Sequence, residues 1–159
     1  MRNVCEERAE ASGIVLKGRF RAVLEGAPGE IKRIVEGPNV VCTNGKEWLA
    51  SFFASAAATA ATLTAKYIAI GTGTTAESAA QTAMVTETAR VSAGAMSYVS
   101  NQIYRVIATF ASGTGTGAVT EYGLFTSSAN GTMISRDLED VINKGANDTL
   151  TVQYELTIS

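Results

Sequence analysis

Residues 149–159 have the sequence TLTVQYELTIS, and this stretch decides the fold class. Its polar and apolar side chains alternate without exception, the apolar ones being Leu150, Val152, Tyr154, Leu156 and Ile158. A β-strand directs successive side chains to opposite faces, whereas an α-helix would scatter these five around its circumference. Burying them contributes roughly 8–15 kcal/mol before conformational entropy is subtracted. The alternation therefore predicts a strand with one face in a core.

Similar patterns occur along the rest of the chain. Residues 13–25 and 31–36 flank the turn sequence GAPG, which predicts a β-hairpin ended by Gly37-Pro38. Further strands are expected over residues 66–70, 87–99 (with Gly94 as a bulge or bend), 102–110, 118–126 and 132–138. Short strands with turns about every 8–12 residues predict a mainly β fold, an antiparallel β-sandwich or jelly-roll-like domain.

One amphipathic helix is predicted over residues 45–57. Asn44 can serve as its N-cap, and Glu47 can bond back to complete a capping box. An apolar stripe follows at helical spacing, formed by Trp48, Leu49, Phe52, Phe53 and Ala56. We expect this stripe to pack on the sheet as part of the core.

The N-terminal residues are charged and lack alternation. We therefore divide the chain into an N-terminal arm, residues 1–17, and a single β-rich domain, residues 18–159. Charged residues from Arg2 to Glu10 occupy the place of a signal peptide's apolar region, so no secretory signal is expected. Residues 48–65 carry no charge, but their Ala, Ser and Thr content argues against a membrane span.

The composition excludes several classes of function. The 159 residues include no histidine, which removes the commonest general base and the commonest metal ligand. The formal net charge of -2 gives no electrostatic basis for binding nucleic acid or an anionic membrane. The sequence thus predicts no catalytic residues, no cofactor, no metal site, and neither a nucleic-acid nor a membrane partner.

The two cysteines, Cys5 and Cys42, are interpreted as unrelated reduced thiols, with Cys42 buried. A disulfide between them, within or between chains, stays open because sequence does not give their geometry.

Three other groups of residues suggest chemistry only superficially. The glycine-threonine runs at 71–74 and 113–117 lack the lysine of a phosphate-binding loop and are interpreted as turns. Asp137, Glu139 and Asp140 are interpreted as a solvated turn, with cation binding left open. A small basic face on the hairpin is expected to be solvated or to contact an acidic protein surface; it comprises Arg19, Arg21, Lys32 and Arg33.

Several different short motifs follow one another in a definite order from residue 18 to the C-terminus. They are GRF at 18–20, GPNVV at 37–41, TNG at 43–45, YIAIGTGT at 67–74, Glu87 with Arg90, EYGLF at 121–125, GTMISR at 131–136 and KGANDTLTV at 144–152. In this order they resemble small structural proteins of tailed-phage virions, a group that includes capsid decoration (cement) proteins and some tail or fibre components. The motifs do not separate these two kinds of component. Residues 87–90 also resemble adaptor segments at the start of tail fibres.

The resemblance implies a non-enzymatic virion structural protein, assembled in the host cytoplasm. The leading hypothesis is a decoration protein that oligomerises, as a trimer or dimer, and bridges the major capsid protein or other virion proteins. A tail, collar or fibre-attachment subunit is the alternative, and a carbohydrate-binding β-sandwich is a more distant one. Partner contact is assigned to residues of the arm and the first strand: Arg2, Val4, Ile14, Val15, Arg19 and Arg21.

Overall fold

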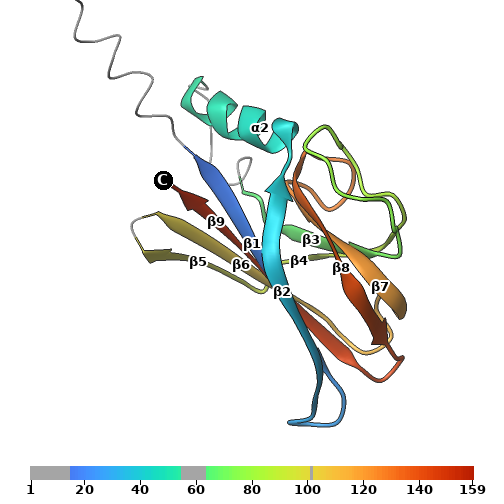
Figure 1. Cartoon of the computed structure of the whole chain (residues 1–159). Coiled ribbons are helices and arrows are strands. Elements are labelled where there is room, and N and C mark those ends of the chain that lie inside the picture. Colours follow the sequence, from blue (N-terminus) through green and yellow to red (C-terminus); the bar gives the residue numbers. More distant parts are fainter. Residues whose placement is uncertain (1–14, 55–63, 101) are drawn as a thin grey trace, which may run out of the picture.

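The computed structural model describes residues 15–54, 64–100 and 102–159. Within these residues, nine antiparallel strands form one sheet that curls into a half-barrel, with one short helix at its end (Figure 1). The strands lie in the order β4-β3-β7-β8-β2-β1-β9-β6-β5. The predicted mainly β, antiparallel architecture with a single helix is therefore confirmed for the part of the chain described.

The predicted C-terminal strand lies near the middle of one half of this sheet. Strand β9, Thr149–Ile158, pairs with β1, Leu16–Glu25, on one side and with β6, Ile103–Phe110, on the other. Its alternate residues Leu150, Val152 and Tyr154 are fully buried, as the alternation predicts. Strand β1 begins at Leu16, so its first two residues belong to the segment that the sequence assigns to the arm.

The predicted hairpin forms, but it does not end at Gly37-Pro38. Strand β2, Ile31–Val41, continues through both residues, and Pro38 lies opposite Arg19 of β1. A proline disrupts a strand where its missing N–H would face a partner. The other neighbour of β2, strand β8 (Met133–Lys144), pairs with it only at Val40 and Val41. Before that point β2 has an edge on which a proline is tolerated.

The predicted strand over 87–99 divides into two at Gly94. Strand β4, Glu87–Ser92, pairs with β3, Tyr67–Gly71, whereas β5, Ala95–Ser100, pairs with β6. At the junction, Ala93 N–H donates to Lys66 O (2.7 Å) and Gly94 N–H donates to Ile107 O (3.0 Å). Two consecutive strands thus occupy the two ends of the sheet order, which draws these ends together and produces the curl.

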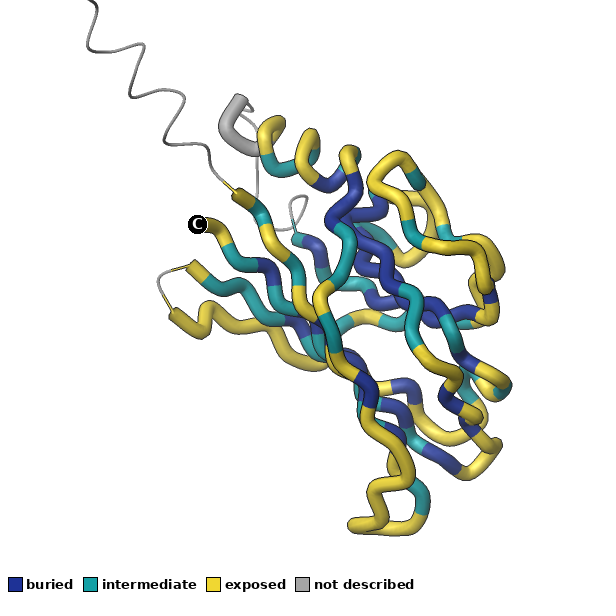
Figure 2. Tube along the Cα trace, in the orientation of Figure 1, coloured by how far each residue is buried: buried dark blue, intermediate teal, exposed yellow. Residues whose placement is uncertain are grey.

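The curl encloses one main core. Phe20 of β1 packs against Tyr122 of β7 (Gly117–Phe125) with ring centroids 4.3 Å apart, and against Tyr154 of β9 at 5.4 Å. Buried residues therefore line the strands of both halves, while the β1–β2 turn and β5 are exposed (Figure 2). In that turn Gly29 adopts a φ of 86°, which a glycine takes without strain.

Helix α2, Thr43–Ala54, begins before the predicted N-cap. Cys42 O accepts hydrogen bonds from Gly45 N–H and Lys46 N–H, so Asn44 lies inside the first turn instead of preceding it. Trp48 is half-buried and packs against the main core, as expected for the apolar stripe. The side chains of Phe52 and Phe53, and all of residues 55–57, lie outside the described residues.

Gly45 brings the start of this helix against β8, which gives a first testable prediction. On helix propensity alone, Gly45→Ala should stabilise by roughly 0.8–1 kcal/mol. A Cβ at this position, however, would lie 2.8 Å from Ile134 Cα, which is main chain and does not move aside easily. We therefore expect Gly45→Ala to lower the free energy of unfolding by about 1–3 kcal/mol, measured by urea denaturation. A stabilised Gly45→Ala protein would contradict this packing.

Candidate functional site

The residues assigned to partner contact are only partly described. Val15 is 47% exposed and exchanges main-chain hydrogen bonds with Ser159, with N···O distances of 2.6 and 2.9 Å. Arg19 and Arg21 are exposed on β1, and both lie near Glu36, at 3.7 and 3.3 Å. Arg2, Val4 and Ile14 lie outside the described residues, and so does Cys5.

The basic face of the hairpin is balanced by acidic side chains. Lys32 Nζ donates to Asp148 Oδ1 at 2.8 Å, a hydrogen bond that raises the pKa of Lys32. Arg33 Nη2 donates to Asp140 Oδ2 at 3.3 Å. With Arg19 and Arg21 beside Glu36, each predicted basic residue has an acidic neighbour. The pairs of Arg19, Arg21 and Arg33 are exposed on both sides, so they add little stability and their side chains stay available to a partner.

The most elaborate arrangement of charge is buried, and the sequence did not predict it. Glu121 of β7 and Arg136 of β8 form an ion pair in which both side chains are 0% exposed. Arg136 Nε donates to Glu121 Oε2 at 3.0 Å, and Nη2 lies 2.8 Å from the same oxygen without a well-directed hydrogen bond. Nη1 donates to Thr75 O (3.0 Å) and to Gln81 Oε1 (3.2 Å).

Glu121 also holds the long connection between β3 and β4. Its Oε1 accepts hydrogen bonds from Gly73 N–H (3.0 Å) and Thr86 N–H (2.6 Å), and its Oε2 accepts one from Val85 N–H (3.0 Å). Burial by itself would raise the pKa of Glu121, but the hydrogen bonds from Thr86, Val85 and Arg136 together lower it. The carboxylate is therefore charged, and its role here is to fix residues 72–86 on the sheet.

Asp137 occupies a different environment from the one predicted. It lies inside β8 opposite Tyr122, so its side chain shares the core face, and it is only 1% exposed. Its Oδ2 has no hydrogen-bond partner. Burial, followed by the negative charges of Glu139 and Glu77, raises the pKa of Asp137 to about 8. The predicted solvated turn is wrong at this residue because the strand runs on to Lys144.

The three carboxylates of the predicted acidic cluster are near enough to influence one another but do not point to one common site. The side chain of Asp140 is 86% exposed and points to Arg33, whereas Glu139 approaches Gly37, where an added Cβ would lie 2.7 Å from Glu139 Oε1. No group of three acidic or cysteine ligands able to hold a metal occurs within the residues that the structure describes.

Lys144, at the end of β8, is a second buried charge outside the sequence predictions. It is 2% exposed, and its Nζ donates to Ala111 O (3.0 Å) and to Asp148 O (2.7 Å). Burial lowers the pKa of Lys144. Gly145 N–H donates to Asp148 Oδ2 at 2.8 Å, so this lysine and this aspartate together tie two turns at the same end of the sheet.

The glycine runs and Cys42 have the structural roles that the sequence suggests. Gly113 and Gly115 have positive φ angles in the β6–β7 turn, and so does Gly117 at the start of β7. Gly73 packs tightly against Glu121. Cys42 is fully buried as a free thiol, and burial raises its pKa.

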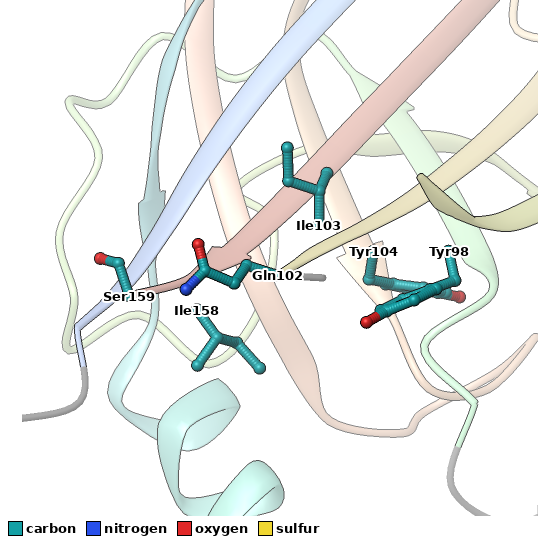
Figure 3. A pocket seen from close by; sticks show the side chains of 6 residues that line it. All are labelled: Tyr98, Gln102, Ile103, Tyr104, Ile158 and Ser159. Atoms are coloured by element: carbon teal, nitrogen blue, oxygen red, sulfur yellow. The ribbon is translucent and has the colours of Figure 1, made fainter. Parts of the chain in front are cut away.

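A shallow hollow lies where β5, β6 and β9 end (Figure 3). It is lined by Tyr98, Gln102, Ile103, Tyr104, Ile158 and Ser159. Tyr104 Oη donates to Ala65 O at 2.9 Å, and burial raises the pKa of Tyr104 to about 12. A phenol with this pKa is protonated at neutral pH and is unsuited to act as a base. The hollow thus offers apolar contact to a neighbouring chain or ligand.

Comparison with known proteins finds no matching family model, no matching curated protein and no matching solved structure. In the described part of the chain, no helix is both long and apolar enough to cross a bilayer.

Proposed function

We propose that this chain is a non-enzymatic structural protein of a tailed-phage virion, and that it decorates the capsid and cements neighbouring capsid subunits. The order of motifs from residue 18 onward, which resembles that of such proteins, supports this proposal. Its mechanism is mechanical, because a preformed β block bound to several subunits at once resists their separation. Repetition of weak contacts around a shell turns them into strong retention.

The observation that carries the proposal is that the buried charged side chains hold the protein's own main chain in place. Glu121 and Arg136 fix the β3–β4 connection, and Lys144 fixes the turns at the far end of β8. These groups act on the protein's own main chain, as expected of a scaffold selected for rigidity. A rigid subunit loses little conformational entropy when it binds a neighbour, which favours a structural role.

The curled sheet supports the narrower expectation of a sandwich-like or jelly-roll-like domain. The β1–β9–β6 half and the β3–β7–β8 half face each other across the core, as the contact between Phe20 and Tyr122 indicates. In such a domain the outward faces are free for partners. Arg19 and Arg21 lie on an outward face of β1, and Val15 is exposed just before this strand. We keep these three as the described residues that contact the major capsid protein or another virion protein.

The location of the protein in the particle tests this proposal. We expect heads separated from tails to retain the protein in many copies, detected by mass spectrometry and by imaging of the shell surface. Its presence in tails and absence from heads would overturn the decoration role and favour the tail, collar or fibre-attachment subunit. Specific binding on a glycan array, with no copies in either fraction, would favour the carbohydrate-binding alternative.

A further inference from the structure

Strand β5 differs from every other strand in its exposure. All six of its residues are exposed, whereas each of the other described strands has buried or half-buried positions. Met96, Tyr98 and Val99 are 46%, 73% and 42% exposed. Three of the nine exposed large hydrophobic residues in the described part of the chain thus belong to this one strand. Such a concentration indicates an interaction surface.

Strand β5 is also an edge of the sheet. It pairs with β6 on one side, and no strand of the described residues pairs with its other side. An open edge presents main-chain N–H and C=O groups that another extended segment can pair with. Proteins commonly protect such edges with charge, proline or a β-bulge. The β5 sequence AMSYVS has no charge and no proline, and its register shift lies at the end of the strand, between Tyr98 and Ser100. At the opposite end of the sheet, β4 carries the ion pair of Glu87 and Arg90 (2.6 Å).

We propose that β5 pairs with β5 of a second copy of this chain, antiparallel about a two-fold axis, so that the two sheets become one. The absence of charge favours this occupant, because self-pairing of β5 brings no like charges together. A two-fold contact also closes after two copies, since the same strand serves both partners.

The side chains of β5 suit one register in particular. With Ser97 on the axis, Met96 lies opposite the second copy's Tyr98, and symmetry repeats this contact. Residues opposite each other in antiparallel strands share a face, and a thioether packs favourably on an aromatic ring. Tyr98 is the cross-strand partner of Tyr104, beside which it lies in the hollow at the strand ends (Figure 3). The incoming Met96 therefore covers a ring that is already supported from one side.

The contact is expected to be weak. A stable interface commonly buries about 800 Å² on each partner, and a six-residue strand, about 20 Å long, covers less than this. We therefore expect a dissociation constant of roughly tens to hundreds of micromolar. In this respect the inference rests on the proposed function, since an ordered array of subunits supplies the high local concentration that a weak contact needs.

Two lysine variants test the pairing, one on β5 and a matched control on β8. Val99→Lys places a charge on β5, and Val141→Lys places the same charge on β8 at nearly equal exposure, 41% against 42%. In sedimentation measurements from about 10 μM to about 1 mM, wild type should form a dimer, and Val99→Lys should raise its dissociation constant by about tenfold or more. Val141→Lys should behave as wild type. A wild type that is monomeric throughout, or a Val99→Lys protein that dimerises equally well, would overturn the proposal.

The register has a separate test. Opposed residues in an antiparallel pair have Cα atoms about 4.5–5.5 Å apart, which a disulfide can span. In a Cys5→Ser background, Ser97→Cys should therefore form a disulfide-linked dimer under mild oxidation. Ser112→Cys, exposed in the β6–β7 turn, is the control for random collision. Equal rates of cross-linking for the two variants would rule out Ser97 on the axis.

These results separate the two proposals. Loss of β5 pairing in a protein that is still found on heads would remove the self-contact and leave the decoration role intact. Pairing through β5 in a protein found only in tails would support the self-contact and overturn the decoration role.

Discussion

Replacing Glu121 by glutamine is expected to lower the free energy of unfolding by about 3–5 kcal/mol, the usual cost of breaking a buried ion pair. Arg136 would stay fully buried without a counter-charge. The amide would also replace one acceptor oxygen by a donor. Oε1 accepts from Gly73 and Thr86, and Oε2 accepts from Val85 and Arg136, so either orientation of the amide leaves two donors facing an NH₂ group. Urea denaturation measures this loss.

The same substitution at Glu155 provides a matched control. Glu155 also pairs with an arginine across two antiparallel strands, at 2.7 Å from Arg105 Nε, but the two side chains are 17% and 33% exposed. Glu155→Gln should therefore cost about 0–1 kcal/mol. If the two variants lost equal stability, burial would not be what makes the Glu121–Arg136 pair important. Hydrogen exchange of residues 72–86 should accelerate in Glu121→Gln alone.

The Asp137→Asn variant is expected to be more stable than wild type at pH 8, with a difference that shrinks as pH falls through 5 and closes below 3.8. The folded protein raises the pKa of Asp137 from its ordinary value of 3.8 to about 8, chiefly through burial and then through Glu139 and Glu77. A raised carboxyl pKa means that the folded state holds the proton longer, so stability is full below 3.8 and is lost as pH rises towards 8. At 1.36 kcal/mol per unit, wild type should lose about 3 kcal/mol relative to Asp137→Asn between pH 5 and pH 8.

Other charged groups titrate as well, so the informative quantity is the difference between the two proteins. Glu121 and Asp148 have lowered pKa values, and each contributes stability that is lost as pH falls, in wild type and variant alike. Asp140→Asn is the control, because the side chain of Asp140 is 86% exposed and its replacement should change stability by less than about 0.5 kcal/mol. If the difference in free energy of unfolding between wild type and Asp137→Asn did not vary with pH, Asp137 would be ionised in the folded protein without cost.

The parts of the fold that the sequence predicted are those in which a local pattern decides the outcome. The alternation in β9 and the turn residues of the β1–β2 hairpin each specify their element without reference to the rest of the chain. The predicted strand bounds differ from the structure where pairing with a neighbouring strand determines where a strand continues or ends. Pro38 is tolerated because β8 diverges from β2 there, and β4 and β5 separate at Gly94 because they pair with different strands.

The buried charges were beyond sequence reasoning for the same reason. Glu121 stands in an otherwise uncharged strand between Val119 and Tyr122, and that placement was a usable signal of a special role. Its three main-chain donors, however, come from a connection more than thirty residues away. The charges around Asp137 predict a solvated turn, but its place opposite Tyr122 in β8 puts it in the core.

The junction at Ala93 and Gly94 has a consequence for how the protein opens. Edge strands that are far apart in the chain can fray independently of each other. Here the two edge strands, β4 and β5, are consecutive in the chain. Separation of β5 from β6 therefore also strains the pairing of β4 with β3. We therefore expect the two edge strands of the half-barrel, β4 and β5, to open together or not at all.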